Sequence, residues 1–551
     1  MKFQSLNKIF EQSFKDHWSR PALSNYQGET LKYGDLAQRV EYFHLAFEKL
    51  GLQKGDRVAI CSKNQANWGV SFIAATTYGA VPVPILHEFK ADSIHHLVNH
   101  SEAKAFFVDE GIWEHLSISE IPDVDMIVEL RTLDFIHAGT NDPAAFKQEV
   151  QNLYDEKYPQ GIRPEDICYH EDQADELAII NYTSGTSGFS KGVMIPYRAL
   201  WNNVRFARED AEPQMNCKSE VVSMLPSAHM YGLMFEFIFE MTIGAHVYFL
   251  TKIPSPKVIL GAFADVHPDI IISVPLIIEK VYKAQVKPKL DKFGLLVKLP
   301  VIRSVIFNKV RSSLIEAFGG NFEEVILGGA AFNPEVEAFM NKVKFRFTVG
   351  YGMTECAPII TYEKWSKARL YSCGRPVKGI EVRIDSPDPQ NIPGEVQVKG
   401  LNVFLGYYKD ENSTKATFTE DGWFRTGDMG VLDKDNYLYL KGRSKCMILG
   451  PSGQNIYPEE LEGVINNAKY VADSLVVEDN GGLTALIYPD SNQAKLDKLS
   501  EEEVEKLIND SMPEINKVLP AYAQIRKVEF MKEDFERTPK KSIKRYLYLK
   551  N

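Results

Sequence analysis

The sequence has no Cys-x-x-Cys pair, and its six cysteines are scattered over 551 residues. This scatter argues against the common zinc spacings and a disulfide framework, and it favours a reducing compartment. A long uninterrupted apolar run is also missing. The two most apolar stretches, 64–87 and 225–250, are broken by prolines or by Glu236 and Glu240. Neither stretch predicts a membrane span.

Positive charge is in the minority, with 63 Lys and Arg against 74 Asp and Glu, and the net charge is −11. An acidic balance argues against nucleic acid as a general partner, so none is predicted. The first eight residues lack the apolar core of a signal peptide, and we predict a cytoplasmic protein. A chain of this length exceeds one hydrophobic core, which indicates two or more domains.

The stretch 181–198 carries the most specific chemistry in the chain. An apolar strand expected at 177–180 leads into small hydroxyl residues, two glycines and a cation: Thr183, Ser184, Gly185, Thr186, Ser187, Gly188 and Lys191. Glycine lets backbone N–H groups converge on an anion, while hydroxyls and a lysine add donors and charge. The order Ser190-Lys191-Gly192 differs from a Walker A loop. We predict a polyphosphate-binding loop, because a plain Ser/Gly turn leaves the lysine and the strand unexplained.

Residues 183–192 resemble the phosphate loop of the adenylate-forming superfamily, which contains acyl-CoA synthetases, firefly-type luciferases and peptide-synthetase adenylation domains. The resemblance covers Tyr33 to Arg545, with the motifs in family order. Ser190 departs from it, since the family usually has proline there, and this change is expected to alter loop stiffness more than chemistry.

The pattern of elements predicts an α/β fold. Strands alternate with helices between residues 30 and 110, which is typical of a parallel sheet with helices on both faces. A strand-rich section from 373 to 428 looks like a small β-barrel, and the residues after 450 predict a smaller α+β domain. We therefore expect a large N-terminal adenylation domain of parallel α/β sheets plus the barrel, at 1–441, and a mobile C-terminal domain at 442–551.

A glycine turn is expected after the strand that begins at Val325. Its side chains are small enough for a flat ring to lie against the backbone, and the matching family turn forms a wall of the adenine pocket: Gly329, Ala330 and Ala331. In the same superfamily, 350–355 matches a very specific motif. The resemblance implies that Tyr351, with Gly352 and Met353, binds adenine. It also implies that Thr354 bonds the phosphate and that Glu355 holds Mg²⁺, a role that suits a hard carboxylate oxygen.

Four further positions take their roles from the resemblance. His229 matches a residue that borders the acyl site, although a lone histidine is more often structural. Asp428 matches the acceptor of the ribose hydroxyls, Arg443 a nucleotide ligand and Lys445 the pivot between domains. Gly453 lies in a glycine loop that faces the thiol channel in the family. Cys446 stands where the family commonly has an acidic residue.

The C-terminal motif departs from the family, whose members end with Thr-x-x-Gly-Lys. Counting from Thr538 places Ser542 at the lysine position, and a serine cannot supply the cation that stabilises a pentavalent phosphorus. Lysines at 540, 541 and 544 lie within two residues of it. Lys541 is the predicted catalytic lysine, and a solvated basic tail is the alternative.

Together the motifs predict an AMP-forming fatty acyl-CoA synthetase of the medium- or long-chain branch, with fatty acid, ATP and coenzyme A as substrates. A fatty acyl-AMP ligase that loads a carrier protein and a catalytically impaired nucleotide-binding homologue are the alternatives. The stretch 283–318 mixes basic and apolar residues, and from Ile302 onward it predicts an amphipathic helix ended by Gly319-Gly320. That helix either packs on its own domain or contacts the inner membrane surface peripherally.

Overall fold

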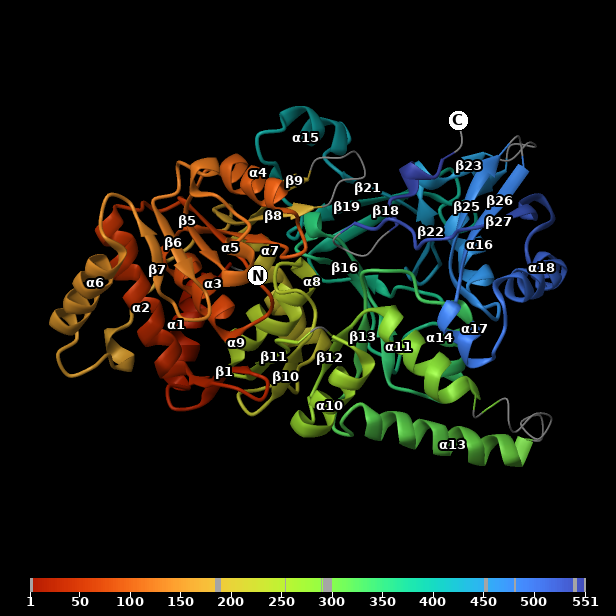
Figure 1. Cartoon of the computed structure of the whole chain (residues 1–551), viewed down its shortest axis with the longest axis horizontal. Coiled ribbons are helices and arrows are strands. Elements are labelled where there is room, and N and C mark those ends of the chain that lie inside the picture. Colours follow the sequence, from red (N-terminus) through yellow and green to blue (C-terminus); the bar gives the residue numbers. More distant parts are fainter. Residues whose placement is uncertain are drawn as a thin grey trace.

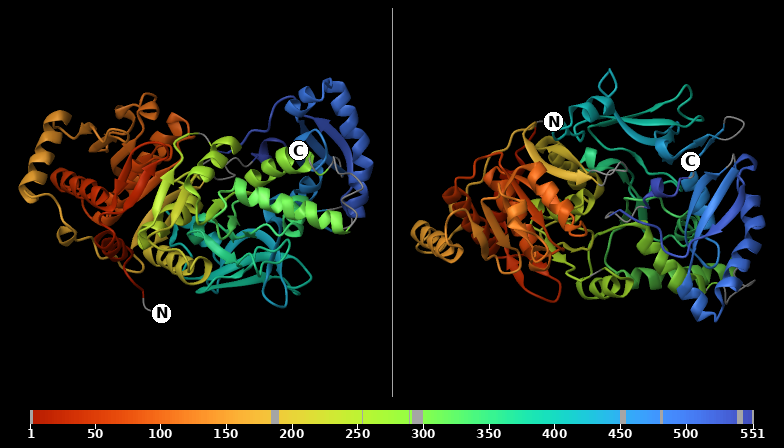
Figure 2. Two further views of the ribbon diagram at one scale, coloured as in Figure 1. Left: turned by 90° about the horizontal axis from the view of Figure 1, so that it is seen from below. Right: turned by 45° about the horizontal axis from the view of Figure 1, so that its top comes forward.

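The computed structural model describes residues 3–183, 190–252, 254–288, 290, 300–449, 454–479, 482–538 and 543–549. It confirms the predicted α/β class. Figure 1 shows a large N-terminal body built on several sheets and a smaller C-terminal lobe at the end opposite α6 (Pro143–Lys157). The smaller lobe stays at one end in both further views of Figure 2.

The first sheet has the order β4-β3-β5-β6-β7, with β7 alone antiparallel to its neighbour. Its strands are β3 (Arg57–Cys61), β4 (Val81–Ile85), β5 (Ala103–Val108), β6 (Met126–Glu129) and β7 (Phe135–Ala138). Alternate β3 residues enter two different cores: Val58 and Ile60 join that of α2 (Tyr33–Leu50) and α3 (Ala66–Tyr78), whereas Ala59 joins that of α4 (Ala91–Ser101). Helices therefore cover both faces, as the two-residue period of a strand requires.

Two further sheets place strand ends beside one another. One has the order β10-β11-β1-β2 and the other the parallel order β12-β13-β14, and a bridge from Val221 to Ile270 connects them. The strands are β1 (Pro21–Asn25), β2 (Thr30–Lys32), β10 (Glu220–Ser223), β11 (His246–Phe249), β12 (Ile271–Ser273), β13 (Val325–Leu327) and β14 (Phe347–Val349). Because β10, β12, β13 and β14 run parallel, their carboxyl ends meet at one edge.

The region predicted as a small β-barrel forms two neighbouring antiparallel sheets, and the pairings of its described strands do not close a ring. The first sheet contains β15 (Tyr351–Gly352), β16 (Ile359–Tyr362) and β17 (Arg375–Pro376). The second contains β18 (Ile380–Asp385), β19 (Gly394–Gly400), β21 (Phe424–Leu432) and β22 (Leu438–Arg443). A separate sheet pairs β9 (Lys191–Pro196) with both β8 (Leu177–Thr183) and β20 (Gly406–Tyr407).

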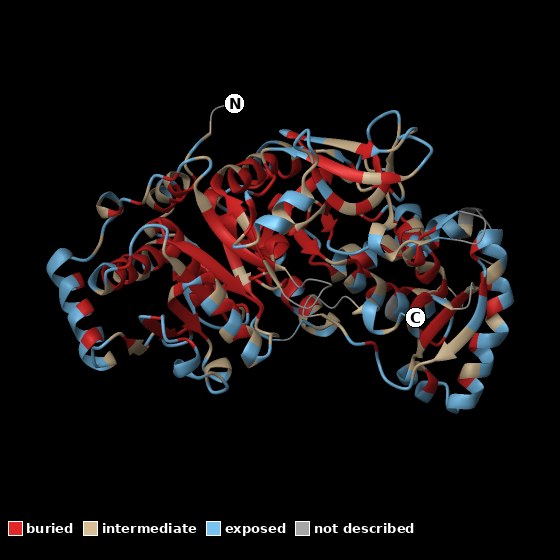
Figure 3. Ribbon diagram, turned by 90° about the horizontal axis from the view of Figure 1, so that it is seen from above, coloured by how far each residue is buried: buried red, intermediate tan, exposed pale blue. Residues whose placement is uncertain are grey.

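The C-terminal lobe has a hydrophobic core of its own, in which Ile465, Ile487 and Ile508 take part. Its sheet, β25-β26-β27, is flanked by helices, and the elements are β23 (Ile448–Leu449), β24 (Asn455–Ile456), α16 (Pro458–Ile465), β25 (Val471–Asp479), β26 (Gly482–Pro489), α17 (Ser491–Leu496), α18 (Glu501–Val518) and β27 (Ile525–Phe530). Figure 3 shows buried strands behind the mostly exposed α18. The predicted boundary at 441/442 falls inside β22 and stays a prediction.

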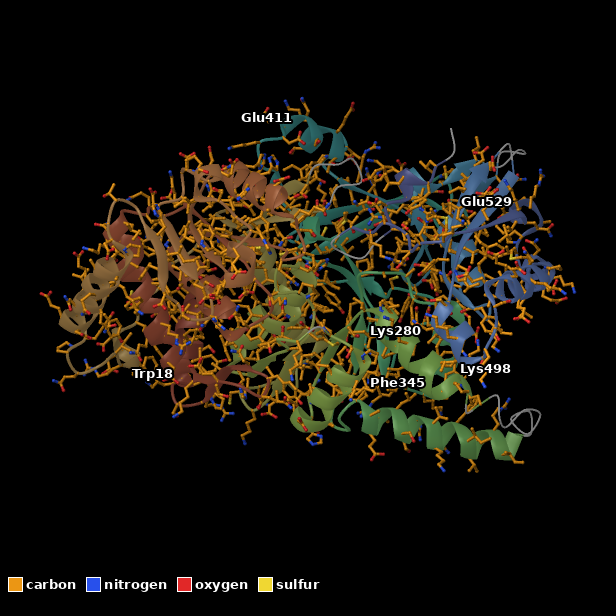
Figure 4. The ribbon with its side chains drawn as sticks, in the orientation of Figure 1. Trp18, Lys280, Phe345, Glu411, Lys498 and Glu529 are labelled. Carbon is orange, nitrogen blue, oxygen red and sulfur yellow. The ribbon has the colours of Figure 1, made fainter. Side chains whose placement is uncertain are left out.

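The predicted amphipathic helix is α13 (Pro300–Ala317), which runs along the lower edge of the body (Figure 1). Ile306 and Leu314 are buried against their own domain. Phe345 is labelled above this helix in Figure 4, and its ring lies 5.5 Å from that of Phe318. Among the described residues, no helix is long and apolar enough to cross a bilayer.

Candidate active site

Three predicted site segments meet at the shared edge of the parallel strands. The chain that leaves β10 reaches His229, the chain after β13 turns at Gly328-Gly329, and the chain after β14 continues into Gly350-Tyr351. All of these residues line one cavity. Gly329 has a φ of +80°, a left-handed backbone conformation that favours glycine. His229 begins the helical turn α8 (Met230–Leu233), where its Nδ1 accepts a hydrogen bond from the Tyr231 N–H at 3.3 Å.

The segment 350–355 is held in a close turn against a neighbouring loop. A Cβ atom on Gly352 would lie 2.2 Å from the carbonyl oxygen of Pro358, so only glycine fits there. The next amide, that of Met353, donates to the same carbonyl at 2.9 Å. Thr354 and Glu355 are buried behind this turn. The glycine therefore lets the backbone of the predicted nucleotide turn approach Pro358 and fixes where Thr354 and Glu355 lie.

Asp428 connects two of the predicted nucleotide ligands. The Tyr351 hydroxyl donates to its Oδ2 at 2.6 Å, and the Arg443 Nε lies 2.8 Å from its Oδ1. The pairing of β21 with β22 sets Asp428 directly opposite Arg443. Burial raises the pKa of the Asp428 carboxyl, and the Arg443 guanidinium opposes this rise. Each carboxylate oxygen keeps a second lone pair, so ribose hydroxyls could be accepted there without breaking either contact.

Glu355, Lys191 and Tyr407 form a second cluster. The Tyr407 hydroxyl donates to Glu355 Oε1 at 3.0 Å, and Lys191 Nζ lies 4.7 Å from the centre of the Tyr407 ring. The β20–β9 pairing brings Tyr407 opposite Val193, two residues after the lysine. Lys191 also donates to Ser413 Oγ at 2.7 Å. Thr183 is opposite Lys191 in the β8–β9 pair, so both predicted phosphate ligands stand at the same end of the hairpin.

The Glu355 carboxylate fits the predicted magnesium role in one respect. Tyr407 engages only one of its oxygens, and among the described residues no hydrogen bond occupies Oε2. The described part of the chain has no group of three or more His, Cys, Asp or Glu side chains that could hold a metal ion. A single carboxylate is nonetheless sufficient for Mg²⁺, which is often held by one or two carboxylates, substrate phosphates and waters.

The remaining predicted residues lie elsewhere or outside the described residues. Lys445 is exposed in the short turn after β22, between the two domains. Ala330 and Ala331 follow Gly329 in an exposed loop. The predicted ligands Ser184, Gly185, Thr186, Ser187 and Gly188, together with Gly453 and Lys541, lie outside the described residues.

The segment around Lys541 is nevertheless anchored at both ends. Arg537 pairs with Asp473 at 2.7 Å, and both guanidinium Nη atoms of Arg545 contact the Glu462 carboxylate at 2.8 Å. Asp473 and Glu462 belong to β25 and α16 of the small domain. These two ion pairs therefore hold the ends of the C-terminal segment to the same domain.

Sequence reasoning did not identify two residues that support the site. Tyr407 is 52 positions away from Glu355 in the chain, so no local sequence pattern predicts their contact. Tyr231 donates its hydroxyl to the Ile326 carbonyl at 2.9 Å, and a Cβ on Gly328 would lie 3.1 Å from its ring. The sequence signals were a Gly-Tyr-Tyr at 406–408, within the strand-rich section predicted as a barrel, and a tyrosine two residues after His229.

The chain belongs to the AMP-binding enzymes. The model of that family matches residues 10–408, and the model of the AMP-binding enzyme C-terminal domain matches residues 447–551. The resemblance to the adenylate-forming superfamily is thereby confirmed.

Relatives named as long-chain-fatty-acid–CoA ligases are similar over most of the chain. One is FadD15 of Mycobacterium bovis, 26% identical over 81% of this chain and 74% of its own length. Another, from Escherichia coli, is 26% identical over 84% of this chain and 81% of its own length. The fold is similar to ATP-bound MatB from Rhodopseudomonas palustris, with a TM-score of 0.77, 22% identity and coverage of 99% of this chain and 98% of that one.

Proposed function

We propose that this chain is an AMP-forming acyl-CoA synthetase that activates a fatty acid with ATP and transfers the acyl group to coenzyme A. The observation that carries the proposal is the cavity beside the nucleotide turns. Its wall includes Gly350 to Thr354 at one side and apolar side chains elsewhere: Phe206, Met215, Phe235, Phe239, Ile270 and Ile272. The composition of this wall suits an apolar chain whose reacting end meets the nucleotide. The cavity has a volume of about 60 Å³, enough for a few water molecules, so the lining side chains would move apart to admit such a chain.

Adenylation joins a carboxylate oxygen to the α-phosphorus of ATP and releases pyrophosphate. Charge develops on the phosphoryl oxygens, so the protein contributes mainly position and electrostatic stabilisation. We assign Asp428 and Tyr351 to holding the nucleoside and Lys191 and Thr354 to the phosphates. Glu355 would hold Mg²⁺, which neutralises charge on the phosphates when bound. Lys541 would supply the cation at the reacting phosphorus.

Thioester formation then requires coenzyme A thiolate to displace AMP, and we propose that the small domain rotates about Lys445 between the two steps. Among the described residues, two ion pairs and several hydrogen bonds join the predicted domains. The ion pairs are Lys441–Glu460 at 3.2 Å and Arg443–Asp428 at 2.8 Å. Asn333 donates to Asn467 Oδ1 at 2.5 Å, and Lys283 Nζ donates to the Asn466 carbonyl at 3.1 Å. Such contacts are weak enough to break during rotation.

Pyrophosphate release with a chain-length series of fatty acids, with and without coenzyme A, tests the activity. We expect acyl-AMP without coenzyme A and thioester only with it. Acyl-AMP that persists after coenzyme A is added would instead favour a carrier-protein-loading acyl-AMP ligase. Absence of both products with every acid would favour a nucleotide-binding homologue without activity.

We also propose peripheral contact of the region 283–318 with anionic membranes. The apolar stripe of α13 is partly occupied, because Ile306 and Leu314 face the protein, so the exposed basic face would make the contact. Arg303 and Lys309 lie on that face, and Val305 is 64% exposed beside them. Each basic group near an anionic surface contributes about 1 kcal/mol, screened by salt. Liposome co-sedimentation should increase with anionic lipid, and binding that ignores lipid charge would contradict the proposal.

A further inference from the structure

The acyl cavity contains two acidic side chains among its apolar ones. Glu212 and Glu240 both line it, with 3% and 0% of their surfaces exposed. Neither carboxyl oxygen of Glu240 has a hydrogen-bond partner among the described residues. Glu212 differs, because it accepts from the Gln214 side chain and its carboxyl group is hydrogen-bonded to that of Glu324. A buried polar group without a hydrogen-bond partner lowers the stability of the fold. The cavity wall therefore carries a carboxyl group that a ligand could hydrogen-bond.

Glu236, on the same helical segment, provides a comparison with Glu240, because the backbone holds its carboxylate by hydrogen bonds. Glu236 lies four residues before Glu240 and is equally buried. Its Oε2 accepts from the amides of Met224 and Leu225 at 3.1 and 3.0 Å, and from Ser223 Oγ at 3.2 Å. Glu236 is also absent from the lining of the cavity. One oxygen of Glu236 is thus held by three donors of the fold, although its Oε1 has no partner among the described residues. Glu240 has no partner on either oxygen, and it lines the cavity.

The acids lie away from the nucleotide turns. His229 begins the helical segment beside those turns, and Glu240 is eleven residues further along it. At about 1.5 Å per residue, this separation is roughly 16 Å. An acyl chain whose carboxylate meets the nucleotide would extend along this segment, so its far part would reach the wall that carries Glu240. Burial raises the pKa of Glu240 to about 8, which makes a neutral carboxylic acid the main form at pH 7.

We propose that the cavity accepts acyl chains with a hydroxyl group near the end far from the carboxylate, and that Glu240 hydrogen-bonds this hydroxyl. This inference rests on the proposed acyl-CoA synthetase function. A hydroxyl both donates and accepts, so it can satisfy a neutral carboxyl group in either direction. An ammonium group in the same place would first have to leave water, which is unfavourable in an apolar cavity. A plain methyl end would leave the carboxyl oxygens unpaired.

The test compares kcat/KM for thioester formation with matched acids over a chain-length series. Each length has an ω-hydroxy acid, an acid of the same size that ends in methyl, and an ω-amino acid. At the length that reaches Glu240, we expect the hydroxy acid to be preferred over its methyl counterpart by about tenfold to a hundredfold. The amino acid should be the poorest of the three.

Three variants test whether Glu240 is the residue that causes the preference for the hydroxy acid. Glu240→Leu should abolish or reverse the ratio between hydroxy and methyl acids, whereas Glu240→Gln should keep a hydroxyl preference because an amide also donates and accepts. Glu236→Gln, outside the cavity, should leave the ratio unchanged. Equal use of both acids by the wild type, or the same ratio in Glu240→Leu, would overturn the inference and leave water as the partner of these acids. Absence of turnover with every acid, plain ones included, would instead reject the proposed function.

Discussion

The Tyr407 hydroxyl donates to the carboxylate of Glu355 at 3.0 Å, and the same ring lies beside the ammonium group of Lys191. One side chain thus orients the predicted magnesium ligand while its face contacts the predicted phosphate cation. Lys191 gains a cation–π contact with this ring, which partly replaces the hydration of its ammonium group. Tyr407 therefore fixes how Glu355 and Lys191, the predicted metal and phosphate ligands, lie relative to each other.

Glu355→Gln should lose Mg²⁺-dependent turnover while the fold stays intact, because an amide carries no charge for a cation held by few protein oxygens. Tyr407→Phe keeps the carboxylate and loses only its orienting bond, so we expect a smaller rise in the Mg²⁺ concentration needed for half-maximal rate. Rates across a magnesium titration measure both effects. A Gln variant that matches the wild type at limiting Mg²⁺ would show that Glu355 is not the metal ligand.

Asp428→Asn should raise the KM for ATP by about tenfold or more, because hydrogen bonds to a charged acceptor contribute about 1.5–3 kcal/mol. The loss also removes the charge partner of Arg443, 2.8 Å away. Tyr351→Phe keeps the ring predicted to stack on adenine and loses only the hydroxyl bond, so its KM should rise a few-fold. Pyrophosphate release over an ATP series compares the two. A larger loss in Tyr351→Phe than in Asp428→Asn would contradict the assigned roles.

Lys541→Ala should slow adenylation by two or more decades, on the order of 3 kcal/mol, since it removes the cation at the reacting phosphorus. Thioester formation from supplied acyl-AMP should stay nearly unchanged, because that step uses the other orientation of the small domain. Lys544→Ala is the matched control, since Lys544 Nζ already pairs with Glu536 Oε2 at 3.0 Å. Equal loss in both half-reactions, or in neither, would mean that another lysine acts.

Asn333→Asp should change the two half-reactions in opposite directions. The Asp side chain retains the helix cap of α14 (Pro334–Lys342), where Oδ1 of Asn333 accepts from the Glu335 N–H at 3.0 Å. It loses the amide donor that contacts Asn467 of the small domain. One neutral hydrogen bond of about 1 kcal/mol corresponds to a roughly fivefold shift between domain orientations. Single-turnover rates for each half-reaction measure this shift, and a parallel fall of both rates would indicate simple damage.

Glu240→Gln should change the pH dependence of stability. The pKa of Glu240 is about 8 in the folded protein, against an ordinary 4.5. Between these values the folded chain holds a proton that the unfolded chain has released. Its contribution to the free energy of unfolding is therefore fully present below pH 4.5 and falls as pH rises towards 8, by at most about 1.4 kcal/mol per pH unit.

The Gln side chain does not titrate, so the variant should lose less stability than the wild type between pH 5.5 and pH 8. Thermal unfolding midpoints at a fixed scan rate measure the difference, which we expect to be a few degrees. Glu411→Gln, on an exposed residue at the tip of the large domain (Figure 4), is the control and should parallel the wild type. Parallel pH curves for Glu240→Gln and the wild type would show that Glu240 is not held neutral.

Local patterns predicted the elements of the fold well. The expected alternation of strands and helices between residues 30 and 110 is present, and the helix expected from Ile302 onward is α13. These elements could be predicted because burial periodicity is a property of neighbouring residues. The strands of the predicted barrel instead belong to separate sheets whose described pairings do not close a ring. The periodicity of a single strand does not show which distant strand it pairs with. Phe235 and Phe239, on the helical segment that follows His229, line the same cavity as that histidine.

Contacts over long separations could not be predicted in the same way. In the sequence, Glu240 is only an acidic residue that interrupts an apolar run. The residues next to it in the chain do not show that its carboxyl group lacks a hydrogen-bond partner. The same holds for Tyr407, whose contact with Glu355 depends on how β20 pairs with β9. Roles carried over from the family for Lys445, Gly453 and the phosphate loop stay predictions.

The pairs Arg537–Asp473 and Arg545–Glu462 both lie within the small domain, on either side of the lysine-bearing segment. A rotation of that domain as a rigid unit therefore carries the lysine along without breaking either pair. Fixing the ends of the segment costs conformational entropy when the domain folds. A rigid rotation of the domain would not add to that cost, because the ends stay fixed throughout. The proposed catalytic lysine would then approach the nucleotide only when the whole small domain does.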